Sequence, residues 1–243
     1  KPAVWLEAIG KYKATTTGCP NFALDYCVEK ISDEQKQKID LTSLTVFYCG
    51  SEPIRKESFE NFSKAFAPCG FKEKMFLPCY GLAESTLMTT GIDAIEEPKY
   101  LRLDKTDLEK GKINFNENGD DFVEVVSCGK PWDDNEILIA DPESNEKMPE
   151  KEIGEIFIKG SSVGKGYWNA PEETASVFGV FTKNPDEGPC LRTGDLGFIH
   201  RKNLYITGRK KDLIIIRGTN HYPQLLEATT EDCHDALQHN ACA

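Results

Sequence analysis

The segment Leu77–Thr86 places several chemically useful side chains directly after an apolar, strand-like run. Tyr80 is followed by Gly81, which lets backbone approach closely, and then by the carboxylate of Glu84. In open α/β sheets, ligands lie beyond the carboxyl ends of strands, where a tyrosine ring could stack on a base. The Glu84 carboxylate could hold Mg²⁺, and the two hydroxyls after it could bond phosphate. The alternative is a tight turn with a core tyrosine and a solvated glutamate.

Two later segments offer a carboxylate and a group of cations. Asp195 lies between Gly194 and Gly197, and an aspartate held in this way could accept both hydroxyls of a ribose. The alternative for this segment is a hairpin turn. Arg209 and the two lysines after it could meet a phosphate or a ribose, or they could form an exposed charged turn.

The elements that must position these residues alternate between helix and strand in the first 80 residues. Residues 1–40 are predicted to be mostly helical, with a break at residues 18–21 and a capping box at Ser32 and Gln35. Leu44–Cys49 and Met75–Tyr80 are uncharged and predict buried strands, and the amphipathic Lys56–Phe66 predicts a helix between them. This rhythm indicates a parallel α/β layer.

The composition and the hydrophobic periodicity of the sequence change after about Gly91. Residues 93–125 hold ten acidic and five basic residues and show few periodic signals. Short strands follow, split by turn residues, at Glu136–Ala140, Ile153–Lys159 and Leu204–Ile206. This pattern is typical of an antiparallel β subdomain. The last 20 residues predict a helix, and neither end of the chain has the features of a domain start or end, so we expect a fragment of a longer protein.

Composition limits the classes of function. The chain has 243 residues, of which 39% are hydrophobic, enough for one large domain or two small ones. Lys and Arg number 29 and Asp and Glu 40, so the net charge of −11 argues against nucleic acid or an anionic membrane as the main partner. No apolar run approaches the roughly 20 residues of a transmembrane segment. The nine cysteines form no C-x-x-C pair and are expected to be reduced, in a cytoplasmic protein.

The order and spacing of several motifs resemble the adenylate-forming superfamily of acyl-CoA synthetases, luciferases and peptide-synthetase adenylation domains. Within it, the chain looks most like a fatty acyl-AMP ligase, and the resemblance covers essentially all 243 residues. The superfamily motifs are Tyr80–Glu84, Gly166–Asn169 with Pro171, Glu172, Thr174 and Phe178, Thr193–Asp195, and Gly208–Asp212. The subfamily signs are residues 18–22, 126–131 and 215–224.

The resemblance implies an α/β fold in three parts. Residues 1–97 would be the C-terminal part of a large α/β nucleotide-binding subdomain with a parallel sheet. Residues 98–207 would form an antiparallel, barrel-like β subdomain. The polar stretch 93–125 would hold an insertion found in fatty acyl-AMP ligases that is thought to limit domain rotation, the alternative being an ordinary surface loop. Residues 208–243 would be the hinge and the truncated start of a small α+β C-terminal domain.

The resemblance also implies roles for individual residues in joining a fatty acid to ATP. The catalytic residues would be Glu84, which also holds Mg²⁺, Arg209, which reaches ribose or phosphate, and Lys211 at the hinge. Tyr80 would stack on adenine and Asp195 would bind the ribose hydroxyls. The remaining predicted ATP-binding residues are Gly50, Ser51, Glu52, Gly81, Ser85 and Thr86, and the predicted lining of the acyl tunnel is Asn21 and Phe22.

Such enzymes form an acyl-adenylate and pyrophosphate, and then pass the acyl group to a thiol. By resemblance, the acceptor is the phosphopantetheine arm of an acyl carrier protein. One alternative is an acyl-CoA synthetase that uses coenzyme A. The other is a non-catalytic module that binds a nucleotide or a carrier protein.

Four departures from the family pattern bear on activity. The family's phosphate loop is expected before Lys1, and its C-terminal catalytic lysine after Ala243. Ala83 stands where the superfamily often has Thr, and Leu225 stands where the subfamily usually has Asp. We therefore predict that this chain alone forms most of the adenine and ribose pocket yet catalyses little or nothing.

Overall fold

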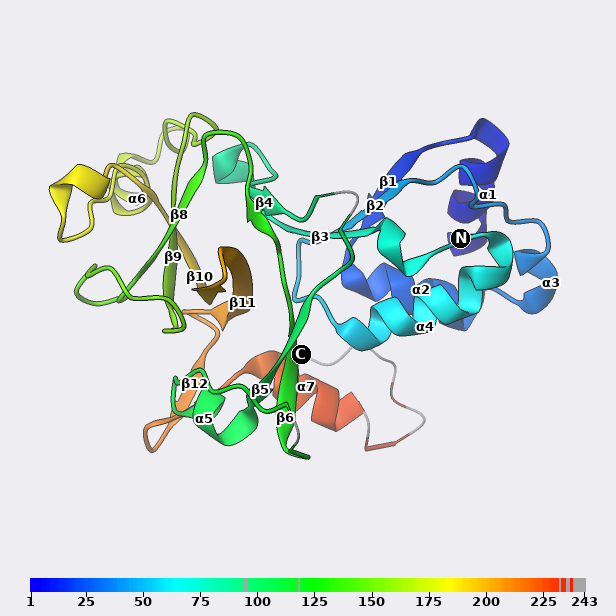
Figure 1. The fold of residues 1–243 in the computed structure, drawn as a ribbon. Helices are drawn as coiled ribbons and strands as arrows, with labels where there is room; N and C mark the ends of the chain where they lie inside the picture. Colours follow the sequence, from blue (N-terminus) through cyan, green and yellow to red (C-terminus); the bar gives the residue numbers. More distant parts are fainter. Residues whose placement is uncertain (94–95, 118, 232, 235–236, 238–243) are drawn as a thin grey trace.

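The computed structural model describes residues 1–93, 96–117, 119–231, 233–234 and 237. Figure 1 shows three groups of elements: α1–α4 with β1–β3, the sheet of β8–β11 with α6, and below them β5, α5, β6, β12 and α7. In chain order the helices and strands are α1 (Pro2–Tyr12), β1 (Thr16–Cys19), α2 (Asn21–Lys30), α3 (Asp33–Lys36), β2 (Val46–Cys49), α4 (Lys56–Phe66), β3 (Phe76–Tyr80), β4 (Thr90–Gly91), β5 (Tyr100–Asp104), α5 (Lys105–Glu109), β6 (Phe122–Val126), β7 (Lys130–Pro131), β8 (Glu136–Ala140), β9 (Gly154–Lys159), α6 (Pro171–Val177), β10 (Leu191–His200), β11 (Asn203–Arg209), β12 (Ile214–Ile216), β13 (Thr219–His221) and α7 (Pro223–Glu231).

The first sheet has the order β1-β2-β3-β4-β7. Its strands β1, β2 and β3 are parallel, which confirms the predicted parallel α/β layer, and β4 and β7 continue the sheet in antiparallel fashion. The strand β1 falls where a break between helices was expected. It is a four-residue edge strand with a glycine, Gly18, beneath the ring of Tyr48, so its apolar signal is weak.

Aromatic side chains fill the core between this sheet and its helices. Phe59, Phe62 and Phe66 on α4 are fully buried, as their spacing predicted. The ring of Phe47 on β2 lies within 5.8 Å, centroid to centroid, of four other aromatic rings, mostly edge to face, as such rings prefer. The predicted capping box of α3 is present, with Ser32 and Gln35 bonding each other's backbone N–H. This core fixes the carboxyl ends of β2 and β3.

The second sheet has the order β11-β10-β9-β8 and is antiparallel throughout, as expected. The expectation of a barrel-like subdomain is wrong, because within the described parts of the chain β8 and β11 are the two edges of an open sheet. A sheet of only four strands with ordinary twist is too narrow to curl round and close into a barrel. The strand β10 was not predicted, since the glycines of Thr193–Gly197 favour a turn.

In its described residues the polar stretch 93–125 contains regular secondary structure, and its identity as the insertion of fatty acyl-AMP ligases stays a prediction. It contains the antiparallel pair β5 and β6 with the short helix α5 between them. Leu103 and Leu108 from this unit are buried beside Phe198 and Tyr205 of the second sheet. Most apolar residues of β5, α5 and β6 face this small core, whereas Tyr100 packs against the first core and Phe115 is exposed.

The C-terminal part closes that same small core. The hairpin β12–β13 leads into α7, confirming the predicted helix in its described residues up to Glu231. Tyr222 is 2% exposed and packs among the residues of β5, α5 and the second sheet. In contrast, Ile214–Ile216 are exposed. In the described part of the chain, no helix is long and apolar enough to cross a membrane.

Candidate active site

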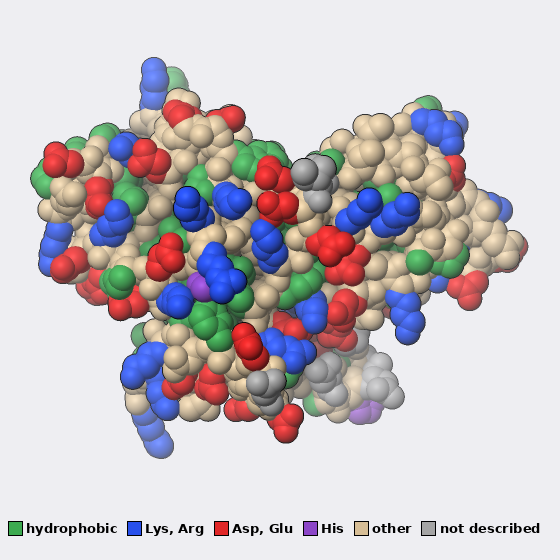
Figure 2. All heavy atoms as spheres, in the orientation of Figure 1, with side chains coloured by type: hydrophobic (Ala, Val, Ile, Leu, Met, Phe, Trp, Pro, Cys, Tyr) green, Lys and Arg blue, Asp and Glu red, His purple; other side chains and the backbone are tan. Residues whose placement is uncertain are grey.

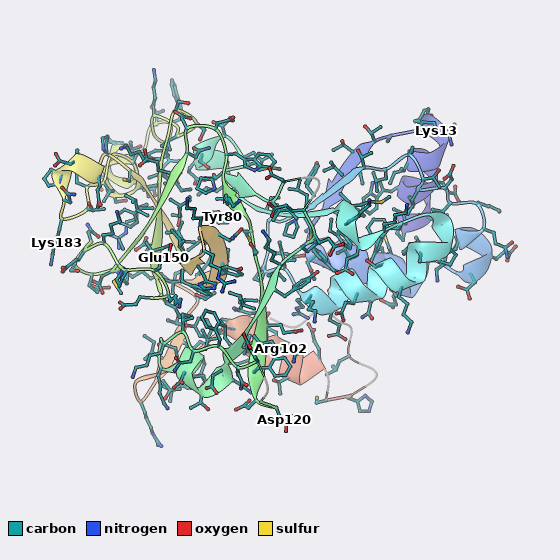
Figure 3. The ribbon with its side chains drawn as sticks, viewed as in Figure 1. Lys13, Tyr80, Arg102, Asp120, Glu150 and Lys183 are labelled. Atoms are coloured by element: carbon teal, nitrogen blue, oxygen red, sulfur yellow. The ribbon has the colours of Figure 1, made fainter. Side chains whose placement is uncertain are left out.

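Three predicted site residues meet where the two sheets approach each other. The hydroxyl of Tyr80, at the end of β3, donates a hydrogen bond of 2.8 Å to Oδ2 of Asp195 on β10. Nε of Arg209, at the end of β11, donates a bond of 2.7 Å to Oδ1 of the same carboxylate. Figure 3 shows Tyr80 beside the brown ribbon of β10 and β11. The fold thus brings Tyr80 to Asp195 and Arg209, which are themselves paired on the consecutive strands β10 and β11.

Burial and charge fix the protonation states in this cluster. Burial raises the pKa of Tyr80 well above its ordinary value, and the neighbouring Asp195 carboxylate adds to the effect. Tyr80 is therefore a neutral donor at physiological pH. The hydrogen bond to Asp195 also raises the pKa of Arg209, which stays a cation. The Asp195 side chain is 11% exposed, whereas half of the Arg209 side chain is open to solvent and available to a ligand.

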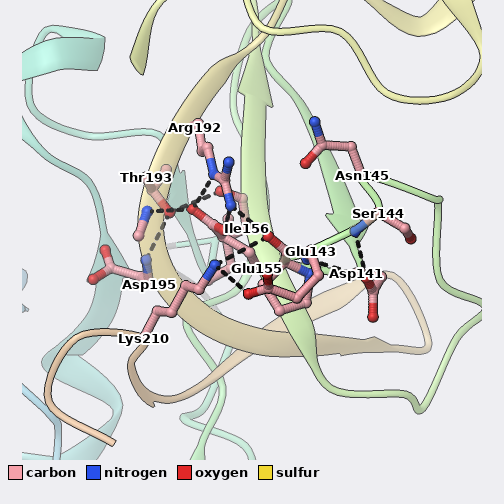
Figure 4. A network of polar contacts seen from close by, with 12 residues as sticks. Asp141, Glu143, Ser144, Asn145, Glu155, Ile156, Arg192, Thr193, Asp195 and Lys210 are labelled. Atoms are coloured by element: carbon pink, nitrogen blue, oxygen red, sulfur yellow. Dashed lines mark hydrogen bonds and ion pairs between the residues drawn. The ribbon is translucent and has the colours of Figure 1, made fainter. Parts of the chain in front are cut away.

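A bulge in β10 presents Asp195 to its partners. The register between β10 and β9 shifts between Arg192 and Leu196. Within the bulge, Gly194 takes a positive φ of 74°, which glycine adopts without strain. The hydroxyl of Thr193 donates to the carbonyl of Ile156 and accepts the backbone N–H of Asp195 (Figure 4). The predicted motif is thus an interrupted strand rather than a turn.

Glu84 lies on a short turn after β3 and is held by a later segment. The hydroxyl of Tyr167 donates to Oε1 of Glu84 at 2.5 Å, and the N–H of Gly164 donates to the Glu84 carbonyl at 2.7 Å. The backbone N–H of Tyr167 in turn donates to the hydroxyl of Thr174. The hydrogen bond to Glu84 raises the pKa of Tyr167 to about 12, so its hydroxyl stays protonated.

The two hydroxyl residues after Glu84 are both engaged within the protein. The Ser85 hydroxyl is fully buried and lies 2.5 Å from that of Thr89. The Thr86 hydroxyl donates to the carbonyl of Ser162 at 2.6 Å. These bonds shape the turn, and the predicted contact of either hydroxyl with phosphate stays a prediction.

Gly50 and Gly81 are required by close backbone approaches. A Cβ at Gly50, just after β2, would lie 2.8 Å from the carbonyl oxygen of Cys79 on β3. A Cβ at Gly81 would overlap the carbonyl of Leu87. Ser51 follows with a positive φ of 72°. The chain at the ends of β2 and β3 is therefore packed backbone against backbone, beside the Tyr80 ring.

Glu52, Phe22 and Asn21 come together at the start of α2, away from the Asp195 cluster. Oε1 of Glu52 accepts the backbone N–H of Phe22 at 2.6 Å, which suits a carboxylate at a helix N-terminus. The Asn21 side chain is 1% exposed: its Nδ2 donates to Ser58 and its Oδ1 accepts the N–H of Arg55. Asn21 thus ties α2 to α4, while the Phe22 ring is 47% exposed.

Lys211 is exposed in the turn between β11 and β12. Its neighbour Lys210 is anchored, because its N–H donates to the Gly194 carbonyl and its Nζ donates to the Pro142 carbonyl at 3.0 Å. On the face drawn in Figure 2, several Lys and Arg side chains gather near the middle of the molecule, although the net charge is −11. A local positive region of this kind suits a phosphate-bearing ligand.

Three residues that hold site residues in place, Tyr167, Glu155 and Arg192, have no predicted role in the sequence. Tyr167 was read only as part of a motif. Glu155 and Arg192 form an ion pair beside the bulge, with Nη2 of Arg192 2.7 Å from Oε2 of Glu155 (Figure 4). A signal for Glu155 did exist, since it is the one acidic residue between Gly154 and Ile158 in a buried, apolar strand.

Comparison with known proteins assigns the chain to a family. The model of the AMP-binding enzyme family matches residues 1–168. The chain is 38% identical to the medium-chain-fatty-acid–acyl-carrier-protein ligase TtuA of Teredinibacter turnerae, and the match covers 100% of the chain and 39% of TtuA. It is 40% identical to the ligase of the same description, JamA, of Moorena producens, with 98% and 41% covered.

Solved structures show the same likeness. The crystal structure of a fatty acyl-adenylate ligase from L. pneumophila in complex with acyl adenylate and pyrophosphate matches with a TM-score of 0.83 and 45% identity. That match covers 94% of this chain and 40% of the other. The chain therefore spans about two fifths of the length of the relatives it matches. Since the family model covers more than half of its residues, the chain belongs to the AMP-binding enzyme family.

Proposed function

We propose that the protein carrying this chain activates a fatty acid with ATP, giving an acyl-adenylate and pyrophosphate, and passes the acyl group to the phosphopantetheine thiol of an acyl carrier protein. The observation that carries the proposal is the meeting of Tyr80, Asp195 and Arg209 at one point. The names of TtuA and JamA support the fatty acid and the carrier protein, and the acyl adenylate bound by the L. pneumophila ligase supports the intermediate.

In this proposal the cluster binds the nucleoside part of ATP. The Tyr80 ring stacks on adenine, with its hydroxyl tied to Asp195. The Asp195 carboxylate has lone pairs beyond those used by Tyr80 and Arg209, and these accept the ribose hydroxyls. The exposed side of the Arg209 guanidinium faces the ribose or the phosphates. Charge neutralisation matters here, because an anionic carboxylate must attack an anionic phosphate.

The residues present fit Mg²⁺ in the mode common to ATP enzymes. No group of three or more His, Cys, Asp or Glu side chains that could hold a metal exists among the described residues. Mg²⁺ in such enzymes is bound by one or two carboxylates together with substrate phosphates and waters. Glu84, half-buried and oriented by Tyr167, can supply such a carboxylate. When bound, Mg²⁺ would neutralise charge on the phosphates.

We assign the remaining predicted roles on the same basis. Lys211 is the hinge residue, because it lies in the exposed turn between the second sheet and β12. The polar stretch 93–125 is the insertion that limits rotation about this hinge, since its residues Leu103 and Leu108 share a core with Tyr222 of the C-terminal part. Phe22 borders the acyl tunnel. A cytoplasmic location rests on the sequence argument from reduced cysteines.

The experiment is ATP–pyrophosphate exchange by the whole protein, with lauric acid and Mg²⁺. Exchange that requires the fatty acid and falls in Asp195→Asn is expected, while Lys183→Gln, at the exposed ion pair with Glu146, serves as the matched control and retains it. The product is then offered a holo-acyl carrier protein or coenzyme A. A thioester formed with free coenzyme A would indicate an acyl-CoA synthetase. No exchange by the folded protein would indicate a binding module.

A further inference from the structure

The bulge that presents Asp195 has lost its normal strand partners. Arg192 pairs with Phe157 and Leu196 pairs with Glu155, so three residues of β10 stand opposite the single residue Ile156 of β9. The backbone groups of such a bulge leave the regular ladder and need other partners. Which groups supply them decides where Asp195 lies.

The side chain of Glu155, on the neighbouring strand β9, supplies a hydrogen-bond acceptor for one backbone group of the bulge. Its Oε1 accepts the backbone N–H of Gly194 at 3.1 Å, in the middle of the bulge. The Glu155 side chain is 2% exposed, so this carboxylate acts in a dry environment where its hydrogen bonds are strong. The opposite side is held by Lys210, whose N–H donates to the Gly194 carbonyl at 2.8 Å.

Arg192 holds the Glu155 carboxylate in turn. Its Nε donates to Oε1 at 2.9 Å and its Nη2 to Oε2 at 2.7 Å, a bidentate pair that allows only one orientation. Its Nη2 also donates to the carbonyl of Pro142 at 2.6 Å. The buried Glu155 charge is therefore paired and oriented, and the two side chains bond each other, the Pro142 carbonyl and the Gly194 N–H.

We propose that Glu155 and Arg192 are positioning residues that set the Asp195 carboxylate for recognition of the ribose hydroxyls. They act through the bulge, with Thr193 as the last link, because its hydroxyl accepts the N–H of Asp195. This inference rests on the proposed binding of ribose by Asp195.

The test compares the affinities of the whole protein for AMP and for 2′,3′-dideoxy-AMP by calorimetry. The wild type is expected to bind AMP at least about tenfold more tightly, since hydrogen bonds from hydroxyls to a carboxylate are strong. In Glu155→Gln this preference falls to about twofold or less, while the affinity for the dideoxy nucleotide changes less than about twofold. Arg55→Gln, at the other ion pair with a buried glutamate, is the matched control and keeps the preference.

The Thr193 variants keep the test decisive if Glu155→Gln does not fold. Thr193→Val removes the hydroxyl that accepts the N–H of Asp195, and it is expected to lose the preference for AMP over the dideoxy nucleotide. Thr193→Ser keeps the hydroxyl and is expected to keep this preference. Parallel weakening of both nucleotides, or an unchanged preference, in the folded variants overturns the inference. A wild type without the preference, or an Asp195→Asn variant that keeps it, overturns the proposed role of Asp195 itself, so the two failures are distinguishable.

Discussion

The hydroxyl of Tyr80 donates a 2.8 Å hydrogen bond to the carboxylate of Asp195, although the two residues lie 115 positions apart in the chain. This bond joins the carboxyl end of the parallel strands to the middle of the antiparallel sheet. It also orients the tyrosine ring, because the hydroxyl is fixed at one end and the backbone at the other. The bond thereby helps to hold the two sheets in one relative position, which in the proposed function is the position that the nucleotide needs.

We expect Tyr80→Phe to weaken AMP binding about three- to tenfold, because the ring keeps its stacking surface but Asp195 loses one donor. Calorimetry on the whole protein measures the affinity, and urea unfolding measures the accompanying loss of stability, about 1 kcal/mol. Tyr80→Ala, which removes the ring as well, is expected to bind much more weakly. Unchanged affinity in Tyr80→Phe would contradict the orienting role of the hydroxyl.

We expect Gly81→Ala to abolish nucleotide binding and to lower the free energy of unfolding by about 3 kcal/mol or more. A Cβ at this position overlaps the carbonyl of Leu87 and must displace the turn that carries Glu84. The matched control is Gly179→Ala, because a Cβ there has no atom within 4 Å and meets only the cost of a positive φ of 69°, about 1 kcal/mol. Similar losses in both variants, measured by urea unfolding, would count against the steric argument.

We expect Tyr167→Phe to raise the Mg²⁺ concentration needed for half-maximal pyrophosphate exchange by about three- to tenfold. The substitution removes the hydroxyl that orients Glu84. The carboxylate then loses conformational entropy when it binds Mg²⁺, which weakens binding. The same substitution at the exposed Tyr26 is the control and should leave the Mg²⁺ dependence as it is. If Tyr167→Phe behaves like Tyr26→Phe, Tyr167 has no part in orienting Glu84.

Tyr222 gives a prediction for alkaline pH. Burial raises its pKa to about 12, whereas a tyrosine in the unfolded chain titrates near 10. The folded state therefore retains a proton that the unfolded state loses, so this contribution is present below about pH 10 and disappears as the pH rises through 12. The loss amounts to about 3 kcal/mol in the free energy of unfolding.

Urea unfolding between pH 9 and pH 12 measures this effect. Tyr222→Phe is expected to show a shallower decline of stability than the wild type, and Tyr12→Phe, at an exposed ring, is the control. The decline becomes shallower rather than flat, since burial also raises the pKa of Tyr205. Equal slopes in wild type and Tyr222→Phe would show that Tyr222 is accessible to solvent in the folded protein.

The sequence predicted the elements whose apolar residues all point to one core. The bounds of α4 agree residue for residue with the predicted Lys56–Phe66, because three phenylalanines at helical spacing leave only one face to bury. The strands β8 and β9 followed in the same way from runs of buried residues. β1 and β10 were missed because their glycines meet needs set by other strands: the Tyr48 ring over Gly18, and the bulge at Gly194.

The sequence points to the residues of the candidate site, but not to the contacts that hold these residues in place. Tyr80, Asp195 and Arg209 stand out because their types and order match a family motif. The contact of Tyr80 with Asp195 depends on how two sheets pack, which no local pattern specifies, whereas Asp195 and Arg209 are paired neighbours on β10 and β11. The sequence also could not tell that Asn21 and Ser85 use their polar atoms inside the protein, since burial of a short polar side chain leaves no periodic signal.

The core around Phe47 has a consequence for the order of events during synthesis. Within the described residues, the buried members of this core lie between Ala3 and Phe76, so their mutual contacts can form on the ribosome while the later residues are still being made. The hydrogen bond of Tyr80 to Asp195 can form only later, because Asp195 and Arg209 are synthesised more than a hundred residues after Tyr80. If Asp195 binds ribose as proposed, a polypeptide released early would be partly folded yet unable to recognise ribose, and nucleotide would stabilise only chains that have been synthesised past Arg209.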